Sequence, residues 1–435
     1  MLNARSLHNC PACPHSMHTH NLAGGSMEGE DVPELPLLLS LPPDLLSLPP
    51  DLLTLSASKV KEKAALRLTC RATRMAVGAA CTQLKWWGDK GAGPVSLTAL
   101  LPASCPNIKL LNCVRMWESL VDRVGCPSTM QTLICHDTGV ADLGPLAACT
   151  GLRTLDCDVT PVGDLGRLAA CTRLQALKCS NTKVANLGPL TACQTLECDF
   201  TPVSALGPLA ACTGLQTLCC GVTKVTDLSP VRACTGLQNL SCDNTQVAHL
   251  DPLTACTGLQ TLKCNYAPVS DLGPLAACTG LQALNCRNTK VANLVPLTAW
   301  TGLQTLECNS TPVADLGPLA ACTGLQTLCC GKTPVANLVP LAACMRLQTL
   351  CCGGTKVADL GPLAACTGLQ TLSCCNTLVA DLGPLAACTG LQTLSRSDTE
   401  VADLGPLEAC TRLQSLWCVR TQVSDLSPLA AFPLL

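Results

Sequence analysis

Residues 303–324 read LQTLECNSTPVADLGPLAACTG, and close variants of this 22-residue unit fill most of the chain. The fourth residue of the unit, Leu306, has an equivalent leucine in each copy. These leucines recur every 22 residues, with one interval of 19: Leu111, Leu133, Leu155, Leu177, Leu196, Leu218, Leu240, Leu262, Leu284, Leu306, Leu328, Leu350, Leu372, Leu394 and Leu416. A repeat of this length predicts a stack of similar coils, each of which contacts only its neighbours.

Each part of the unit predicts a local structure. The segment QTLxC alternates outward and inward positions, which predicts a short strand with leucine and cysteine facing the core. The threonine that follows, as in Thr138 and Thr160, is expected to donate its hydroxyl to the turn backbone. Asp142 and Pro145 then predict the capped first turn of a short helix or 3-10 segment, and a second cysteine, Cys149, points back into the core.

The first eleven residues of the unit match the frame LxxLxLxxNxL, with cysteine at the third apolar position and threonine at the asparagine position. The chain therefore resembles the leucine-rich-repeat proteins with 22-residue, internalin-like repeats. The resemblance implies an α/β solenoid of horseshoe shape over residues 91–435. About fifteen short parallel strands would line its concave face, and short helical or 3-10 turns its convex face.

One coil departs from the period. Between Cys193 and Gln194 the residues TGL of the unit are missing, so this coil lacks its first leucine. Two interpretations stay open: a neutral change in a repetitive sequence, and a local change of curvature that shapes a binding site.

Composition narrows the function classes. The 435 residues include 2% aromatic and 13% charged residues, and the net charge is −2. This balance offers no basic surface for nucleic acid or for an anionic membrane. The most apolar stretch, residues 33–55, is interrupted by prolines and by Asp44 and Asp51, so we expect no membrane span.

The 36 cysteines mostly occupy the two inward columns of the repeat, where they replace leucines. The first thirty residues have no apolar core of a secretory signal. We therefore expect a reducing compartment, the cytoplasm or the nucleus, and cysteines that act as small buried hydrophobic residues. Four cysteines fall on outward positions, where a soft-metal or redox site is an alternative to repeat drift: Cys219, Cys329, Cys351 and Cys375.

Residues 1–32 are polar and predict a disordered tail. Cys10 and Cys13 form a CxxC pair, followed by His15, His18 and His20. Thiolate and imidazole are zinc ligands, but the intervening loop of a zinc finger is absent, so we predict no metal site and no cofactor.

Residues 33–90 predict a small helical region. LPPDLL at 48–53 and LRLTCRATR at 66–74 resemble the F-box, which begins with L-P-x-D/E-L-L. The resemblance implies a Skp adaptor that binds Leu48, Pro49, Leu52, Leu53 and Leu66. A plain helical cap over the first repeat would need many of the same residues, so both interpretations stay open.

No motif for phosphate cradling, dinucleotide binding, acyl transfer or zinc hydrolysis is present, and the sequence predicts no enzyme. The outward positions instead vary from coil to coil, which favours a protein partner on the concave face. We predict that the following residues contact it: Asp156, Asp158, Lys178, Glu197, Asp199, Phe200, Val222, Asn244, Lys263, Tyr266, Arg287 and Glu307.

The chain ends in PLAAFPLL, part-way through a unit. We expect either that Phe432 and the final leucines fold back as a lid or that this end pairs with another chain. The hypothesis from the whole sequence is the substrate-recognition subunit of a Skp–cullin–F-box ubiquitin ligase. The alternative is a leucine-rich-repeat scaffold or regulatory protein with no link to ubiquitin.

Overall fold

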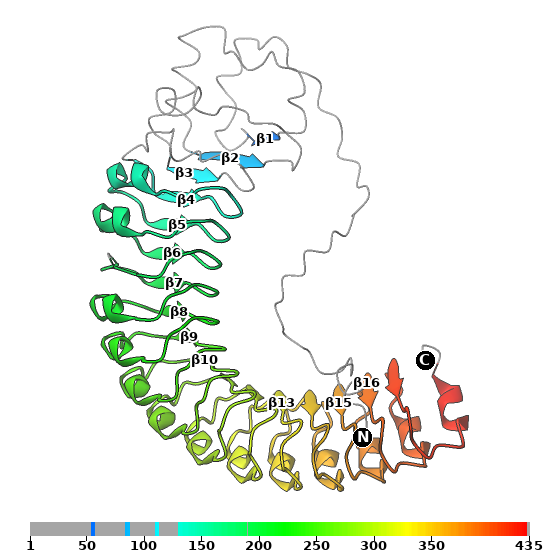
Figure 1. The fold of residues 1–435 in the computed structure, drawn as a ribbon. Helices are drawn as coiled ribbons and strands as arrows, with labels where there is room; N and C mark the ends of the chain where they lie inside the picture. Colours follow the sequence, from blue (N-terminus) through cyan, green and yellow to red (C-terminus); the bar gives the residue numbers. More distant parts are fainter. Residues whose placement is uncertain (1–53, 57–82, 88–108, 113–128, 189, 433–435) are drawn as a thin grey trace, which may run out of the picture.

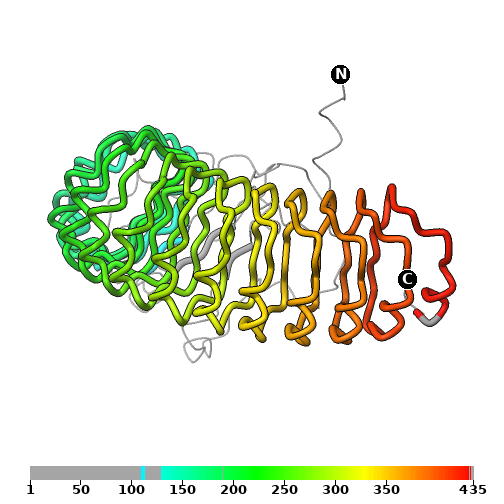
Figure 2. Tube along the Cα trace, turned by 90° about the horizontal axis from the view of Figure 1, so that it is seen from below, coloured from blue at the N-terminus to red at the C-terminus, as the bar shows by residue number. Residues whose placement is uncertain are grey.

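The computed structural model describes residues 54–56, 83–87, 109–112, 129–188 and 190–432. They form a curved stack of coils with short strands on the inner side of the arc and 3-10 helices on the outer side (Figure 1). Seen from below, the coils stand side by side along the whole arc (Figure 2).

One parallel sheet of 17 strands runs through the stack. Each strand pairs with its neighbours in the sequence, and the repeat leucines lie directly opposite one another, as in Leu262↔Leu284. The strands are β1 (Thr54–Ser56), β2 (Gln83–Trp87), β3 (Leu110–Asn112), β4 (Thr132–Ile134), β5 (Thr154–Asp156), β6 (Ala176–Lys178), β7 (Thr195–Glu197), β8 (Thr217–Cys219), β9 (Asn239–Ser241), β10 (Thr261–Lys263), β11 (Ala283–Asn285), β12 (Thr305–Glu307), β13 (Thr327–Cys329), β14 (Thr349–Cys351), β15 (Thr371–Ser373), β16 (Thr393–Ser395) and β17 (Ser415–Trp417).

The outer side of the arc consists of five-residue 3-10 helices. They are η5 (Gly144–Ala148), η6 (Gly166–Ala170), η7 (Gly207–Ala211), η8 (Ser229–Ala233), η9 (Asp251–Ala255), η10 (Gly273–Ala277), η11 (Val295–Ala299), η12 (Gly317–Ala321), η13 (Val339–Ala343), η14 (Gly361–Ala365), η15 (Gly383–Ala387), η16 (Gly405–Ala409) and η17 (Ser427–Ala431). The sequence predicts Asp142 as the N-cap, but Leu143 occupies that position; Asp142 lies one residue before it, and its carboxylate accepts the backbone N–H of Gly144 at 2.8 Å. The predicted capping role is thus performed from the preceding residue.

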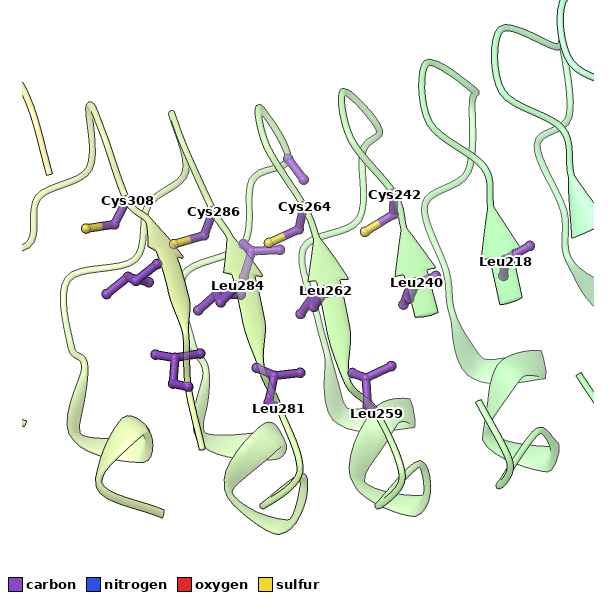
Figure 3. Close-up of a cluster of buried hydrophobic side chains, with 14 of the residues drawn as sticks. Leu218, Leu240, Cys242, Leu259, Leu262, Cys264, Leu281, Leu284, Cys286 and Cys308 are labelled. Atoms are coloured by element: carbon purple, nitrogen blue, oxygen red, sulfur yellow. The ribbon is translucent and has the colours of Figure 1, made fainter. Parts of the chain in front are cut away.

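Rows of leucines and cysteines fill the space between strands and 3-10 helices (Figure 3). The first cysteine column, which includes Cys242, Cys264 and Cys286, is fully buried beside the strand leucines. Among the described residues, the cysteines are free thiols apart from Cys149, which is disulfide-bonded. The prediction that these cysteines act as small buried hydrophobic residues is confirmed at most places of both inward columns; the exceptions are the disulfide-bonded Cys149 and the partly exposed Cys418.

A threonine follows most of the strands, and from Thr138 to Thr399 these threonines are buried and hydrogen-bonded as predicted; Ala267 takes this place after β10, and Thr421 after β17 is only partly buried. Thr138 donates its hydroxyl to the carbonyl of Cys135 at 2.6 Å, and Thr160 donates to Cys157 at the same distance. This bond satisfies a carbonyl at the point where the chain leaves the sheet.

The second cysteine column joins neighbouring coils. The Cys278 thiol donates to the carbonyl of Cys256 at 3.4 Å and to that of Leu253 at 3.8 Å. Trp300 occupies the next place in this column, fully buried, and its indole N–H donates to the carbonyl of Leu275 at 3.1 Å. The larger side chain thus makes the same contact as the thiol, a role that sequence reasoning missed.

The short coil keeps the sheet intact. Strands β6 and β7 pair with Leu177 opposite Leu196, so the three missing residues do not shift the register. None of the described residues of this coil forms a 3-10 helix. The loss is therefore absorbed on the outer side of the arc.

The two ends of the stack are described in part. Strands β1 and β2 pair with each other and β2 pairs with β3, so the sheet extends into residues 33–90, for which we predicted helices. The rest of that segment lies outside the described residues, as does the tail 1–32. Phe432 is buried at the last position of the second cysteine column, while residues 433–435 lie outside the described residues. No helix in the described part of the chain is long and apolar enough to cross a bilayer.

Candidate binding surface

Three columns of side chains face outward on the concave side of the arc. The last residue of each strand forms the strand column, for example Asp156 of β5. Two residues further on, Asp158 belongs to the turn column, and the next residue, Val159, belongs to the tip column. Because the coils are in register, each column repeats along the stack about every 4.8 Å.

The predicted contact residues fall on these columns between β5 and β12. The strand column contains Asp156, Lys178, Glu197, Lys263 and Glu307; the turn column contains Asp158, Asp199 and Arg287; the tip column contains Phe200, Val222, Asn244 and Tyr266. The structure thus brings all twelve onto one continuous surface. Sequence reasoning missed Asp243, which follows the buried Cys242 as Asp199 follows Cys198, so counting positions within the unit would have found it.

Carboxylates of the turn column link one coil to the next. Asp158 accepts the backbone N–H of Ser180 at 2.6 Å, and Asp243 accepts that of Asn265 at 2.7 Å. Asp199 accepts the N–H of Gly221 in the same way. These side chains hold the turns in place and are only partly accessible.

Burial raises the pKa of Asp158 and of Asp199 to about 6. The negative charges of Asp156 and Glu197 raise the pKa of Asp158 further, and those of Glu197 and Asp243 raise that of Asp199. Their hydrogen bonds from backbone N–H groups act in the opposite direction. The neighbouring carboxylates thus add to the effect of burial on both pKa values.

Within the surface over β5–β12, two ion pairs cross between coils. Lys178 Nζ lies 3.0 Å from Glu197 Oε1 on the adjacent strand, and this contact raises the pKa of Lys178. Arg287 Nη1 lies 3.9 Å from Glu307 Oε2. The Lys178 charge is thus already matched within the surface.

Large apolar side chains stand at the tip column of four coils. Val159, Phe200, Val222 and Tyr266 are 48%, 52%, 38% and 47% exposed. Their backbone has φ between +53° and +59°, the left-handed region that disfavours most L residues and especially β-branched ones. Asn181 and Asn244 occupy the coils between them with the same backbone geometry.

The concave side has a different character from β13 to β16. Small residues occupy the strand column there: Cys329, Cys351, Ser373 and Ser395. Cys329 and Cys351 are paired in register as predicted, but both are buried, so the expectation of exposed thiols at these two positions is wrong. Cys219 and Cys375 are partly exposed. No group of three or more metal-ligating side chains is assembled in the described ranges.

The predicted adaptor contacts Leu48, Pro49, Leu52, Leu53 and Leu66 lie outside the described residues, as do Cys10, Cys13 and the histidines near them. Both the adaptor site and the question of zinc in the tail stay predictions from sequence.

No family model and no curated protein matches the chain. Among solved structures, the chain is similar to the functional domain of InlJ from Listeria monocytogenes, which includes a cysteine ladder. The TM-score is 0.66 at 24% identity, over 75% of this chain and 71% of that one. An internalin from the same organism, InlF, has a TM-score of 0.59 at 22% identity, over 71% of this chain and 86% of that one.

The plant peptide hormone receptor RGFR1, solved in complex with RGF2, is also similar. Its TM-score is 0.58 at 14% identity, over 80% of this chain and 68% of that one. At these identities the likeness shows the fold. Together with the sheet and the 3-10 turns, it confirms the predicted leucine-rich-repeat horseshoe and its approximately fifteen repeat strands, β3–β17.

Proposed function

We propose that this protein binds a protein or peptide on the concave side of the arc, over β5–β12, without performing chemistry itself. The observation that carries the proposal is the exposed apolar row of the tip column beside the charged strand and turn columns. Aromatic side chains with a polar surround are the usual anchors of protein interfaces. The complex of RGFR1 with RGF2 offers a precedent for ligand binding by a protein of similar fold.

The test exchanges the anchors for residues that the repeat itself uses. In a Phe200→Asn, Tyr266→Asn variant, asparagine takes the tip position as it does in Asn181 and Asn244, so the turn is preserved. The matched control is Val295→Gly, Val339→Gly, which removes two equally exposed apolar side chains from the convex side and restores the glycine found there in other coils.

Proteins that co-purify with the wild type are compared with those that each variant retains, by quantitative mass spectrometry. We expect a specific partner that the Phe200→Asn, Tyr266→Asn variant loses and the convex variant keeps. An identical set of partners for all three proteins would contradict binding at this surface.

We further propose that residues 33–90 act as an F-box and that the protein is a substrate-recognition subunit of a Skp–cullin–F-box ligase in the cytoplasm or nucleus. The support is the sequence resemblance at Leu48, Pro49, Leu52, Leu53 and Leu66. In this role the concave surface would raise the effective concentration of a target near the ligase. A leucine-rich-repeat scaffold without a ubiquitin link is the alternative.

Co-purification of the full chain with a Skp adaptor separates the two. We expect the wild type to bind and a Leu52→Asp, Leu53→Asp variant to lose the adaptor while keeping the concave-side partner. A wild-type protein that is folded and still fails to bind the adaptor would leave the scaffold as the function.

A further inference from the structure

At the tip column, some residues adopt an unfavourable backbone conformation although the fold does not require those residue types. In ten other described coils, this position holds Asp, Asn, Ser, Lys, Gly or Arg. Most of these residue types tolerate a positive φ or have a flexible side chain. Val159 and Val222 are β-branched, and the left-handed conformation costs about 1–2 kcal/mol for such residues. Because all four apolar tips are exposed by a third or more, packing within the coil does not explain the choice.

The four apolar tips belong to coils β5, β7, β8 and β10, which fall within six consecutive coils. Five coil steps of about 4.8 Å separate Val159 from Tyr266, so the row is about 24 Å long. An extended polypeptide rises about 3.4 Å per residue and would span the row with about seven residues. Alternate side chains on one edge of that polypeptide would meet the row three or four times.

An acidic strip runs parallel to this apolar row over the same coils. The strand and turn columns of β5–β10 hold five carboxylates and two ammonium groups: Asp156, Asp158, Glu197, Asp199 and Asp243, with Lys178 and Lys263. Lys178 is paired with Glu197 at 3.0 Å. Burial is the main cause of the raised pKa of Asp158 and of Asp199, and the neighbouring carboxylates add to it.

We infer that the ligand of the concave surface is an extended polypeptide segment of about seven residues or more, in which apolar side chains alternate with Lys or Arg. Its apolar edge lies against Val159, Phe200, Val222 and Tyr266, and its basic edge lies against the acidic strip. The period of two in an extended chain places these two chemistries on opposite edges, matching two parallel rows on the protein. This inference rests on the proposed function, since it specifies the partner of the same surface.

The test uses defined peptides and the full chain. Three fluorescently labelled nine-residue peptides are titrated by anisotropy: alternating Leu and Lys, alternating Leu and Glu, and alternating Ser and Lys. We expect the Leu/Lys peptide to bind at least about tenfold more tightly than either other peptide, because only it satisfies both rows.

The variants assign the binding to the two rows. Phe200→Asn, Tyr266→Asn should weaken the Leu/Lys peptide about tenfold or more. Asp158→Asn, Asp199→Asn keeps the acceptor for the backbone N–H and should weaken it severalfold with a smaller salt dependence. The convex control Val295→Gly, Val339→Gly should leave the dissociation constant unchanged, and circular dichroism establishes that each variant is folded.

Tight binding of the Leu/Glu peptide, no binding of the Leu/Lys peptide, or binding that survives Phe200→Asn, Tyr266→Asn would overturn the inference. The proposed function has its own readout, the loss of a co-purified partner from that same variant. A partner lost from the variant together with no Leu/Lys binding would leave the proposed function standing and reject this ligand.

Discussion

At the scale of single residues, Asp158 and Asp199 add negative charge to the surface and lower the free energy of unfolding. Both are half-buried, and both bind a backbone N–H of the next coil through one carboxylate oxygen. The chain contains the neutral version of the same contact, because Asn265 accepts the N–H of Arg287 and Asn309 accepts that of Gly331. The charge is therefore not needed for the hydrogen bond.

This comparison predicts a pH-dependent effect of Asp158→Asn, Asp199→Asn. The folded-state pKa of about 6 lies above the unfolded value, so the native state binds more protons between about pH 4 and 6, and the wild-type free energy of unfolding falls as pH rises through that window. The double variant should be about as stable as the wild type at pH 4. At pH 7 it should be more stable by about 1 kcal/mol per site, after allowance for solvent screening.

Urea unfolding at pH 4, 5.5 and 7 measures this difference. Asp156, Glu197, Asp243, Lys178 and Lys263 are the charged groups that act on the two carboxylates, and they are unchanged in the variant. A variant that is less stable than the wild type at pH 7 would show that the charge itself stabilises the turns.

A second residue, Arg396, destabilises the core. Arg396 occupies the first cysteine column between Cys374 and Cys418, fully buried, and its Nε, Nη1 and Nη2 have no hydrogen-bond partner. Burial lowers the pKa of this guanidinium, as expected when a charge is removed from water without a partner.

Restoring the repeat residue with Arg396→Cys should raise the free energy of unfolding by roughly 2 kcal/mol or more. Thermal unfolding followed by circular dichroism checks the gain, and hydrogen exchange should show slower opening of β16 and β17 in the variant. Arg396→Lys is the control, since it keeps an unpaired buried cation. An equal gain in both variants would mean that the charge is not the cause.

At the scale of the element, the coil is the unit that the sequence specifies. The strands, the hydrogen bonds after the strands and the outer 3-10 turns could be predicted from the fixed positions of Leu, Cys, Thr and Pro in the unit. Each of these structures follows from local chemistry that is repeated many times. Substitutions at single places were not predictable. Trp300 takes a cysteine place with its N–H on the equivalent carbonyl of the preceding coil, and the burial of Cys351 depends on tertiary surroundings.

The candidate site followed from the same counting, since every predicted contact residue was an outward position of the unit. The positive φ of the tip column could not be predicted from the repeat pattern of the sequence. Asparagine at this position in several copies is compatible with a positive φ. Val159 and Val222, by contrast, disfavour a left-handed backbone, so this conformation is imposed by the stacking of the coils.

The short coil gives a prediction at this scale. Insertion of Thr-Gly-Leu between Cys193 and Gln194 restores the 22-residue unit, and its leucine should be buried as Leu215 is, which stabilises the fold by about 2 kcal/mol. Insertion of Thr-Gly-Ser has the same length without the apolar side chain. The urea midpoint should therefore rise for the first insertion and not for the second; equal midpoints would mean that the coil has no room for a leucine.

At the scale of the whole molecule, each coil contacts its immediate neighbours and long-range closure is absent from the described stack. Residues 325–346 are one complete unit that contains β13 and η13. Their removal should leave β12 beside β14 with the repeat leucines again in register, because Leu306 and Leu350 are equivalent.

The shortened protein should be monodisperse in size-exclusion chromatography, with a far-ultraviolet spectrum like that of the wild type. It should also keep the concave-side partner, because the proposed contact residues all lie in earlier coils. Removal of residues 325–335 deletes half a unit and should abolish folding, because every later inward-facing residue would be out of register with the coil before it. Equal tolerance of both deletions would contradict a stack built on register.

The near-constant length of the coils, with one exception, has a mechanical consequence. A force applied to the two ends of the arc would peel the described coils from the stack one after another, because each packs mainly against its neighbouring coils. Each 22-residue coil would release about 75 Å of extended chain, while the 19-residue coil between Leu177 and Leu196 would release about 65 Å. In a single-molecule pulling trace that shorter step would mark when the surface formed by Phe200 and its neighbours is lost.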